Sequence, residues 1–259
     1  MPEGPEAYIL SKYIEKLFLN KKITGITSNT KTKVDIPIES EIIQCNSYGK
    51  IIIIVTKDFY MHIHLGITGW FVPKKPRIFK YIFHFGKKDI YLQDTRRFSS
   101  IKILNKDEHL AHLSKYGINI LSVSFTSDIF YKILSASNRN ICSILMDQKI
   151  FSGIGNYIKN EALYLAEISP YRKSSSIPEL KILNLWNTIR FVSFSNLVDW
   201  HNDYKIKLSE EIKKILPEYL EVPYKYYVFE REKDIYKNKV IFDKKHCGRR
   251  TFYVKEIQK

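Results

Sequence analysis

The stretch that decides the fold is DQKIFSGIGNYIKNEAL, residues 147–163. A helical pattern ends near residues 147–149, Gly153 and Gly155 then supply backbone freedom for a turn, and a new helix starts at or just after Asn156. This order predicts a helix–two-turn–helix. Its glycines let a phosphate approach main-chain amides, and a helix N-terminus favours negative charge, so the turn suits binding of DNA phosphates. An ordinary helical corner is the alternative.

The chain on either side of this stretch changes its hydrophobic period twice. Residues 6–18 read as an amphipathic helix, and from about 22 to about 104 short β-rich runs alternate with turn residues, as in an antiparallel sandwich or barrel. Helical patterns follow from about 124 to 216, and strand-like runs return from 226 (KYYVFERE, NKVIFDKK, RRTFYVKEI). We therefore predict an α+β protein with an N-terminal helix and β-sandwich domain (1–120), a helical domain (121–225) and a C-terminal hairpin (226–259).

The charge balance points to a polyanionic partner. Lys and Arg number 42 against 27 Asp and Glu, which gives a formal net charge of +15. The 18 Tyr and 15 Phe include candidates for stacking on unpaired bases, although such residues more often form core. Solubility, or the Lys/Ile/Asn bias of an AT-rich genome, is the alternative source of the charge.

The cysteines and apolar runs indicate an intracellular, reducing location. Cys45, Cys142 and Cys247 are distant from one another and odd in number, which excludes a disulfide framework and a four-thiolate zinc site. The N-terminus has no basic segment followed by an apolar run, so we expect no secretory signal. The run IIIIV at residues 51–55 is too short to span a membrane. The compartment that holds the DNA is left open.

The N-terminal sequence MPEGPEA contains a candidate nucleophile. If Met1 is removed, Pro2 carries a secondary amine, and an α-amino group has a pKa of roughly 7.7–8.0 against about 10.4 for lysine. Such an amine can attack an electrophilic carbon as Schiff-base lysines do, and Glu3 beside it can act as acid or base. The alternative is a helix lead-in, with acids and proline in the first turn.

Two arginines near the C-terminus form a second candidate site. They begin RRTFYV, which follows KKHCG, and a turn between strand-like runs would present them as a fork for phosphate. A solvated hairpin tip is the alternative.

Six motifs occur together and in order along the chain. They are PEGPE (2–6), SYGK (47–50), HLGITG (64–69), DTRRF (94–98), DQKIFSGIGNYIKNEAL (147–163) and RRTFYV (249–254). In this combination the sequence resembles the formamidopyrimidine-DNA glycosylase/endonuclease VIII family of base-excision repair enzymes, from Pro2 to the last residue. The resemblance implies DNA with oxidised bases or abasic sites as the partner, a monomer, and no membrane association.

The resemblance also implies a set of catalytic residues. Pro2 would attack C1′ of the damaged nucleotide, Glu3 would handle protons at the sugar, and Glu6 would support them near the helix start. Lys50 would contact a phosphate and assist. The iminium ion formed at C1′ acidifies the C2′ proton and permits strand cleavage by β- and then δ-elimination, without a metal or nucleotide cofactor.

DNA-contacting residues follow from the same resemblance. The residues implied to bind phosphates are His64, Asn156 and Arg249, with Arg250 as the second choice for the arginine. A damaged base must leave the helix before an amine can reach C1′. The residues implied to fill the space that the base leaves are Ile67, Arg96 and Phe98.

The sequence departs from the family pattern at its zinc finger. Ile235, Asn238, Val254 and Ile257 stand where the four thiolate ligands belong, and Cys247 matches no ligand position. A closed tetrahedral zinc site is therefore not expected there. This ending looks like the zincless finger of some endonuclease VIII-like proteins of vertebrates and giant viruses. We expect apolar packing to replace the metal and strand pairing to hold Arg249.

Lesion preference is divided between two signals. Gly4 in PEGPE looks like the endonuclease VIII branch, which prefers oxidised pyrimidines, whereas Arg96 with Phe98 looks like the pair of the 8-oxoguanine branch. On the first of these signals we predict that the enzyme removes oxidised pyrimidines and hydantoins. The alternatives to this glycosylase/AP lyase are an 8-oxoguanine- or formamidopyrimidine-preferring glycosylase, a catalytically silent member that binds damaged DNA, and an unrelated basic nucleic-acid-binding structural protein.

Overall fold

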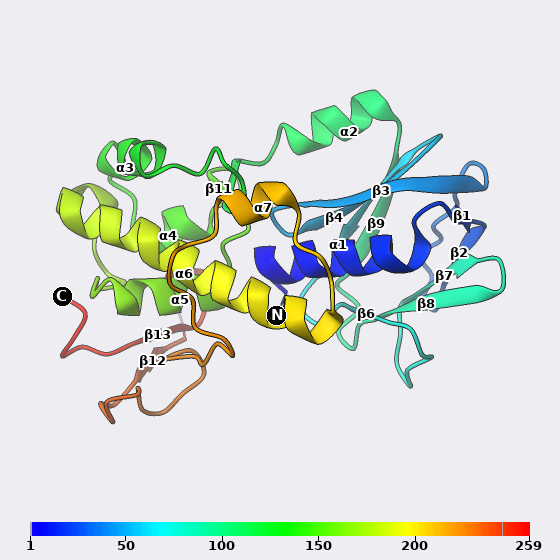
Figure 1. Cartoon of the computed structure of the whole chain (residues 1–259). Coiled ribbons are helices and arrows are strands. Elements are labelled where there is room, and N and C mark those ends of the chain that lie inside the picture. Colours follow the sequence, from blue (N-terminus) through cyan, green and yellow to red (C-terminus); the bar gives the residue numbers. More distant parts are fainter. Residues whose placement is uncertain (1, 245) are drawn as a thin grey trace. The chain divides into compact units, whose positions relative to one another are not determined.

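The structure is a computed structural model that describes residues 2–244 and 246–259, drawn in Figure 1. The chain divides into two compact units. The first comprises the residues up to Lys115 together with Trp200–Lys207, and the second comprises Tyr116–Asp199 and Leu208–Lys259. Within the described ranges, no helix combines the length and the apolar character that crossing a membrane requires.

The first unit consists of helix α1 (Gly4–Phe18), two antiparallel sheets and the short helix α2 (Lys106–Leu113). The five-stranded sheet has the order β1 (Lys22–Ile23), β3 (Ser40–Tyr48), β4 (Ile51–Thr56), β5 (Tyr60–His64) and β9 (Ser100–Leu104). The four-stranded sheet has the order β2 (Gly25–Ser28), β7 (Tyr81–Phe85), β8 (Lys88–Gln93) and β6 (Trp70–Val72). The predicted helix and antiparallel sandwich are confirmed.

One apolar core joins both sheets of this unit to α1. Ile52 and Ile54 of β4 lie in it with Phe71 and Phe83 of the other sheet and Leu10 of the helix. Strand side chains alternate between faces, so residues two apart enter the same core. The sequence pattern does not predict β3, whose pairing with β4 shifts register between Ile42 and Gln44. Such an irregularity breaks the period-2 alternation on which strand prediction depends.

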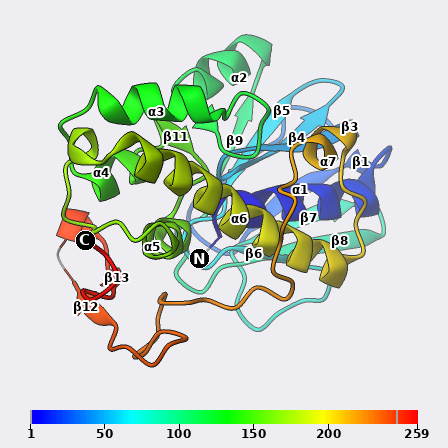
Figure 2. The same ribbon diagram turned by 60° about the vertical axis from the view of Figure 1, so that its left-hand side comes forward.

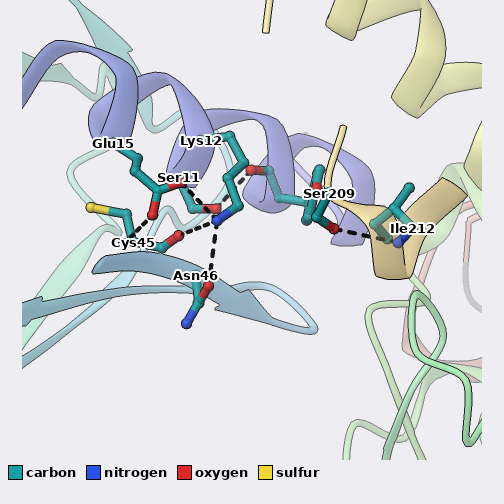
Figure 3. Close-up of polar contacts among 8 residues, drawn as sticks. Ser11, Lys12, Glu15, Cys45, Asn46, Ser209 and Ile212 are labelled. Atoms are coloured by element: carbon teal, nitrogen blue, oxygen red, sulfur yellow. Dashed lines mark hydrogen bonds and ion pairs between the residues drawn. The ribbon is translucent and has the colours of Figure 1, made fainter. Parts of the chain in front are cut away.

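Polar contacts bind α1 to β3 as well (Figure 3). Lys12 Nζ donates to Glu15 Oε2 at 2.8 Å and to the carbonyl oxygen of Cys45 at 2.7 Å. Glu15 Oε1 accepts the backbone N–H of Cys45 at 2.9 Å. The lysine and the carboxylate thus pair with each other and with the backbone of Cys45, and they tie the second half of α1 to β3.

Three histidines connect β5 to α2, a helix that the sequence pattern does not predict. His62 is buried, and its two ring nitrogens lie 2.7 Å from Nδ1 of His112 and 2.7 Å from Nδ1 of His109. A neutral ring can donate through one nitrogen and accept through the other. Burial, followed by the charges of His112, His109 and Lys102, lowers the pKa of His62 to about 3.

This histidine cluster predicts acid sensitivity. Below about pH 6.5 the unfolded chain binds a proton at His62, whereas the folded chain binds it only near pH 3. The contribution of the neutral His62 to the free energy of unfolding is therefore fully present above pH 6.5. It is lost as the pH falls toward 3, by up to about 1.4 kcal/mol per pH unit for one such proton. Urea unfolding at about pH 7.5 and about pH 5 should show the loss in the wild type and a smaller loss in His62→Gln. Equal losses in both proteins would contradict this assignment.

The second unit is mainly helical. Its elements are β10 (Ile118–Asn119), α3 (Ser127–Ser135), α4 (Ile141–Met146), β11 (Phe151–Ser152), α5 (Asn156–Leu165), η1 (Ser174–Ser176), α6 (Glu179–Tyr204, with its last turn in the first unit), α7 (Glu210–Lys214), β12 (Ile241–Asp243), η2 (His246–Gly248) and β13 (Thr251–Tyr253). The end of α4, the two-residue pairing of β10 with β11 and the start of α5 form the predicted helix–two-turn–helix.

The predicted strand at KYYVFERE is wrong. Glu161, fully buried on α5, accepts the backbone N–H groups of Tyr227, Val228 and Phe229 at 2.7, 2.9 and 2.8 Å. Successive N–H groups of a strand point in opposite directions, so three in a row cannot meet one carboxylate from an extended strand. The aromatic and β-branched residues of this segment instead pack in a loop beside β12 and β13 (Figure 2).

Candidate functional site

The N-terminus is held by a reciprocal cap at the start of α1. Pro2 and Glu3 are buried, and Glu3 is the N-cap residue of the helix. Its backbone N–H donates to Glu6 Oε2 at 2.8 Å, and its own carboxylate accepts the N–H of Glu6. A capping box of this kind satisfies two of the backbone donors that a helix start leaves unpaired. Glu6 therefore positions Glu3, while Met1, whose removal the N-terminal hypothesis requires, lies outside the described residues.

Lys50 and His64 lie at the same end of the neighbouring strands β4 and β5 in the five-stranded sheet. Lys50 follows Gly49, whose φ of 53° turns the chain between β3 and β4. The next residue, Ile51, pairs with His64 on β5. Partial burial of the ring lowers the pKa of His64, and so does the nearby charge of Lys50. The register thus brings together a lysine and a histidine that the sequence places in separate motifs.

The hydrogen-bond pattern of His64 identifies its tautomer. The backbone N–H of Gly66 donates to Nδ1 of His64 at 3.1 Å. In the neutral ring the hydrogen is consequently on Nε2, which can donate to an external acceptor. Because His64 is solvent-exposed, this N–H is suited to a DNA phosphate.

The loop that carries Ile67 packs closely against the loop that carries Phe98. A Cβ placed on Gly66, where φ is +67°, would lie 2.7 Å from the carbonyl carbon of Phe98. Glycine is therefore required both for the backbone conformation and for the approach of the second loop. The contact brings two of the three predicted void-filling residues onto neighbouring loops.

Asp94, to which sequence reasoning assigns no role, connects these two loops. It is fully buried, its Oδ1 accepts the hydroxyl of Thr68, and its Oδ2 accepts the backbone N–H of Ser99 at 2.7 Å. Burial alone would raise the pKa of Asp94, but the hydrogen bonds from Thr68, Ser99 and Arg96 lower it below its usual range. The available signal was an acidic residue at the start of DTRRF, directly before two arginines.

Arg96 and Phe98 project from the second loop as a stacked pair. The guanidinium carbon of Arg96 lies 4.9 Å from the centre of the Phe98 ring, and Phe98 is 54% exposed. A large exposed aromatic side chain supported by a cation suits insertion between bases. Both side chains have the exposure and mutual contact that the predicted void-filling role needs.

Replacing Asp94 tests whether the two loops act together. In Asp94→Asn one side-chain oxygen becomes an amide donor, which leaves the Ser99 N–H or the Thr68 hydroxyl without its acceptor. We expect a loss of about 1–3 kcal/mol in urea unfolding and at least about tenfold slower nicking of lesion-containing DNA. Thr68→Val removes the hydroxyl that donates to Asp94 and accepts the N–H of Arg96, but it leaves the bond from Ser99 to Asp94 in place and should have the smaller effect. Wild-type stability and nicking in Asp94→Asn would exclude this positioning role.

In the second unit, Asn156 occupies the first position of α5. It is 5% exposed, and within residues 2–244 and 246–259 its side-chain oxygen has no hydrogen-bond partner. Leaving a buried polar atom unpaired costs about 1–3 kcal/mol, so such an atom at a helix start is typical of a binding position. Gln148 shapes the preceding turn, since its Oε1 accepts the N–H of Gly153 and its Nε2 donates to the carbonyl of Ile154.

The structure distinguishes the two C-terminal arginines. Arg250 forms an ion pair with Glu230 at 2.7 Å. Arg249 is exposed, and no ion pair is found for it among the residues that the structure describes. Lys159 of α5 donates to Thr251 Oγ1 at 3.0 Å, which anchors the strand that follows Arg249. The preference for Arg249 over Arg250 as the phosphate ligand gains support from this difference.

The four positions aligned with zinc ligands differ in their surroundings. Val254 is buried in a cluster with Tyr164, Val228, Val240 and Phe252, and Ile257 packs against that cluster. Ile235, in contrast, is 45% exposed. Apolar packing is thus found at the last two of these positions and not at Ile235.

A buried carboxylate organises the first half of this finger. Asp234 Oδ2 accepts hydrogen bonds from Asn238 Nδ2 at 2.9 Å and from the hydroxyl of Tyr164 at 3.0 Å. Its Oδ1 accepts the backbone N–H of Asn238 at 2.8 Å. Polar contacts of Asp234 therefore act in this segment alongside the expected apolar packing. No sequence signal distinguished Asp234 from the other acids of the segment.

Comparison with known proteins places this arrangement in a family. Residues 1–101 match the formamidopyrimidine-DNA glycosylase N-terminal domain, and residues 116–194 match the formamidopyrimidine-DNA glycosylase H2TH domain. A formamidopyrimidine-DNA glycosylase of Wolbachia from Brugia malayi is 31% identical over 192 residues, which cover 68% of this chain and 71% of the relative. The chain belongs to the formamidopyrimidine-DNA glycosylase family.

Other members and solved structures extend the match over the whole chain. The formamidopyrimidine-DNA glycosylase of Rickettsia bellii is 25% identical, with 100% of both chains covered. The MutM (Fpg) protein of Thermus thermophilus superposes with a TM-score of 0.83 at 21% identity, covering 99% of this chain and 98% of that one. A Lactococcus lactis Fpg variant in complex with a Fapy-dG-containing DNA gives 0.83 at 21% identity over 100% of both chains. These structures establish that this glycosylase has the fold of its family.

Proposed function

We propose that this protein is a bifunctional DNA glycosylase and AP lyase that removes oxidised bases through the N-terminal amine of Pro2. The observation that carries the proposal is the buried Pro2–Glu3 pair, fixed at the start of α1 by the capping box with Glu6. Pro2 and Glu3 are adjacent in the chain, and the cap fixes the backbone that carries both, so Glu3 can exchange protons near the reacting amine. Removal of Met1 is part of the proposal.

The reaction follows from the chemistry of a secondary amine. The nitrogen lone pair of Pro2 forms a bond to C1′ of the damaged nucleotide, the bond from C1′ to the base breaks, and the base leaves with a proton. The amine nitrogen then loses its proton, the C1′–O4′ bond of the sugar ring breaks, and O4′ takes a proton from Glu3, which leaves an iminium ion between Pro2 and C1′. The positive charge of this iminium acidifies the C2′ hydrogen. Loss of that proton expels the 3′ phosphate, and a second elimination expels the 5′ phosphate. Glu3 is the group placed to donate and accept these protons.

Residues in both units support binding of the DNA. His64 offers its Nε2–H at the strand end that it shares with Lys50. Asn156 offers a donor at the start of α5, and Arg249 offers donors just before β13. Each of these donors suits a DNA phosphate. Ile67, Arg96 and Phe98, on two loops in contact, suit the space that an extruded base leaves.

We further propose that the finger hairpin holds Arg249 without zinc at the family's ligand positions. Ile235, Val254 and Ile257 have no metal-binding atom, and the side chain of Asn238 is bonded to Asp234. These residues do not fit a tetrahedral zinc site. The pairing of β12 with β13 and the bond from Lys159 to Thr251 support the hairpin instead.

Two features of the chain bear on which lesion it prefers. Oxidised pyrimidines and hydantoins are favoured by Gly4, through the resemblance of PEGPE to the endonuclease VIII branch. Formamidopyrimidines and 8-oxoguanine are favoured by the stacked Arg96–Phe98 pair and by the names of the relatives. A nicking assay on oligonucleotides that carry thymine glycol, dihydrouracil, a hydantoin, formamidopyrimidine, 8-oxoguanine or an abasic site measures the ranking.

The same assay tests the function itself. We expect nicking of the abasic-site DNA and of at least one oxidised-base DNA, with phosphate left at both ends of the gap. Binding to an abasic-site analogue with no nicking of any substrate would instead identify a catalytically silent member. Binding without preference for lesions would support a structural nucleic-acid-binding protein.

A further inference from the structure

Two cysteines and a histidine from distant parts of the second unit meet beside η2. Cys142 lies in the first turn of α4 and is fully buried, while His246 and Cys247 belong to η2. One potential ligand atom from each residue lies within 4.8 Å of those of the other two. None of the three occupies a finger position aligned with the family's zinc ligands.

A backbone carbonyl fixes the tautomer of the imidazole. Nε2 of His246 lies 2.8 Å from the carbonyl oxygen of Pro170. A carbonyl can only accept, so Nε2 carries the hydrogen and Nδ1 retains a lone pair in the neutral ring. Metal-bound histidines commonly donate their other N–H to a carbonyl or carboxylate in this way. Asn140 fixes the same carbonyl, because its Nδ2 donates to Pro170 at 2.9 Å.

The backbone holds Cys247 in an uncommon conformation. Its φ is 51°, in the left-handed region that non-glycine residues rarely adopt. Its sulfur lies 3.0 Å from Asn140 Oδ1 and 3.2 Å from Ser143 Oγ, so polar partners on the α4 side fix the thiol as well. A strained residue held by several partners is a common feature of ligand sites.

We propose that Cys142, His246 and Cys247 bind one zinc ion, with water at the fourth position. Two thiolates and one neutral imidazole balance the charge of Zn²⁺ and match its preference for sulfur and nitrogen, whereas Mg²⁺ and Ca²⁺ require oxygen ligands. In a tetrahedral site with zinc–sulfur bonds of about 2.3 Å the sulfurs lie roughly 3.8 Å apart. The upper limit of 4.8 Å therefore requires only a small contraction.

The ion would cross-link α4 to the loop that precedes Arg249. The backbone N–H of Arg249 donates to the carbonyl of His246 at 3.2 Å, so the residue directly follows the ligated segment. Zinc at this place would stabilise the entry to β13 from the opposite end of the hairpin to the family's finger site. This consequence is structural and does not depend on the proposed DNA chemistry.

Metal titration of the full-length reduced protein tests the site. After chelator treatment and removal of the chelator, Co²⁺ should produce thiolate-to-cobalt charge-transfer absorption that saturates at one equivalent, and Zn²⁺ should displace it. Zn²⁺ should also raise the thermal midpoint by at least about 3 °C, because it binds the folded chain. His246→Gln and Cys247→Ser should each weaken Co²⁺ binding at least about tenfold.

Cys45→Ala provides the matched control, because Cys45 is buried in the first unit. This variant should keep the absorption and the affinity of the wild type. His246→Gln keeps the buried thiol of Cys142 in place, so its loss of binding cannot be attributed to a disrupted α4. Absence of charge-transfer absorption in the reduced wild type, or its persistence in Cys247→Ser, would overturn the proposal. So would a Cys142–Cys247 disulfide in air together with no metal binding after reduction.

Discussion

A version of the protein with a short N-terminal extension that acylates Pro2 is expected to form no covalent complex with lesion DNA in the presence of borohydride. In this trapping experiment borohydride reduces the iminium ion to an amine, which links the protein permanently to the DNA. The acylated nitrogen is an amide, whose lone pair is delocalised and cannot attack C1′. Lysine residues cannot substitute, because at neutral pH well under a thousandth of an ordinary lysine side chain is unprotonated. We expect nicking of lesion DNA to fall at least about a thousandfold, which corresponds to about 4 kcal/mol of transition-state stabilisation. Gel separation of the cross-linked protein–DNA complex measures the trapping.

The control uses the same extended protein. If the extension ends in a protease site that leaves Pro2 as the first residue, cleavage should restore trapping and nicking together. Binding of an abasic-site analogue should change little before and after cleavage, because the residues proposed to contact phosphates are elsewhere in the chain. Undiminished trapping in the extended form would show that another amine is the nucleophile.

Glu3→Gln has the second largest expected effect. The structure shows that the Glu3 carboxylate caps α1, and the proposed function adds proton exchange at the neighbouring Pro2. Glutamine retains an oxygen that can accept the N–H of Glu6 but cannot exchange protons near neutral pH. General acid–base catalysis typically contributes about 10²–10⁴-fold, so we expect nicking to fall within that range while the unfolding free energy changes little. Single-turnover nicking and urea unfolding on the same preparations measure both quantities.

Two further variants separate the cap from the chemistry. Glu3→Ala loses the cap as well as the acid and should be less stable than Glu3→Gln by about 1 kcal/mol. Glu6→Gln keeps an acceptor for the N–H of Glu3 and should retain most of the nicking activity. If Glu3→Gln nicks lesion DNA at the wild-type rate, the cap is the only role of Glu3.

The parts of the site that are local in sequence were predictable. Pro2, Glu3 and Glu6 lie within one helix start, where capping chemistry depends on residues three apart. The helix–two-turn–helix follows from two glycines between helical patterns, and the structure begins α5 at Asn156 as predicted. In both cases the interactions that determine the local structure lie within a few residues of each other.

Misread segments were those whose hydrogen bonds have distant partners. KYYVFERE has the composition of a strand, but its amides bind Glu161 on α5. The amino-acid composition of a segment indicates how much of it is buried. It does not indicate which way the backbone N–H groups point, because that depends on where their acceptor lies. Residues 106–113 form α2, whose contact with the sheet passes through His62 rather than through an apolar stripe. Patterns based on hydrophobic period do not detect such a helix.

The sequence alone determined the family of this protein, its α+β fold and a set of candidate residues. Each of these depends on short motifs and on the order in which they occur. Only the tertiary structure decided which residues meet. Strand register brings Lys50 to His64, the close approach at Gly66 brings Ile67 to Phe98, and Asp94 connects their loops. The packing of η2 against α4 brings Cys142 to Cys247. Contacts between distant segments depend on how whole elements pack, and no local pattern of residue types encodes that geometry.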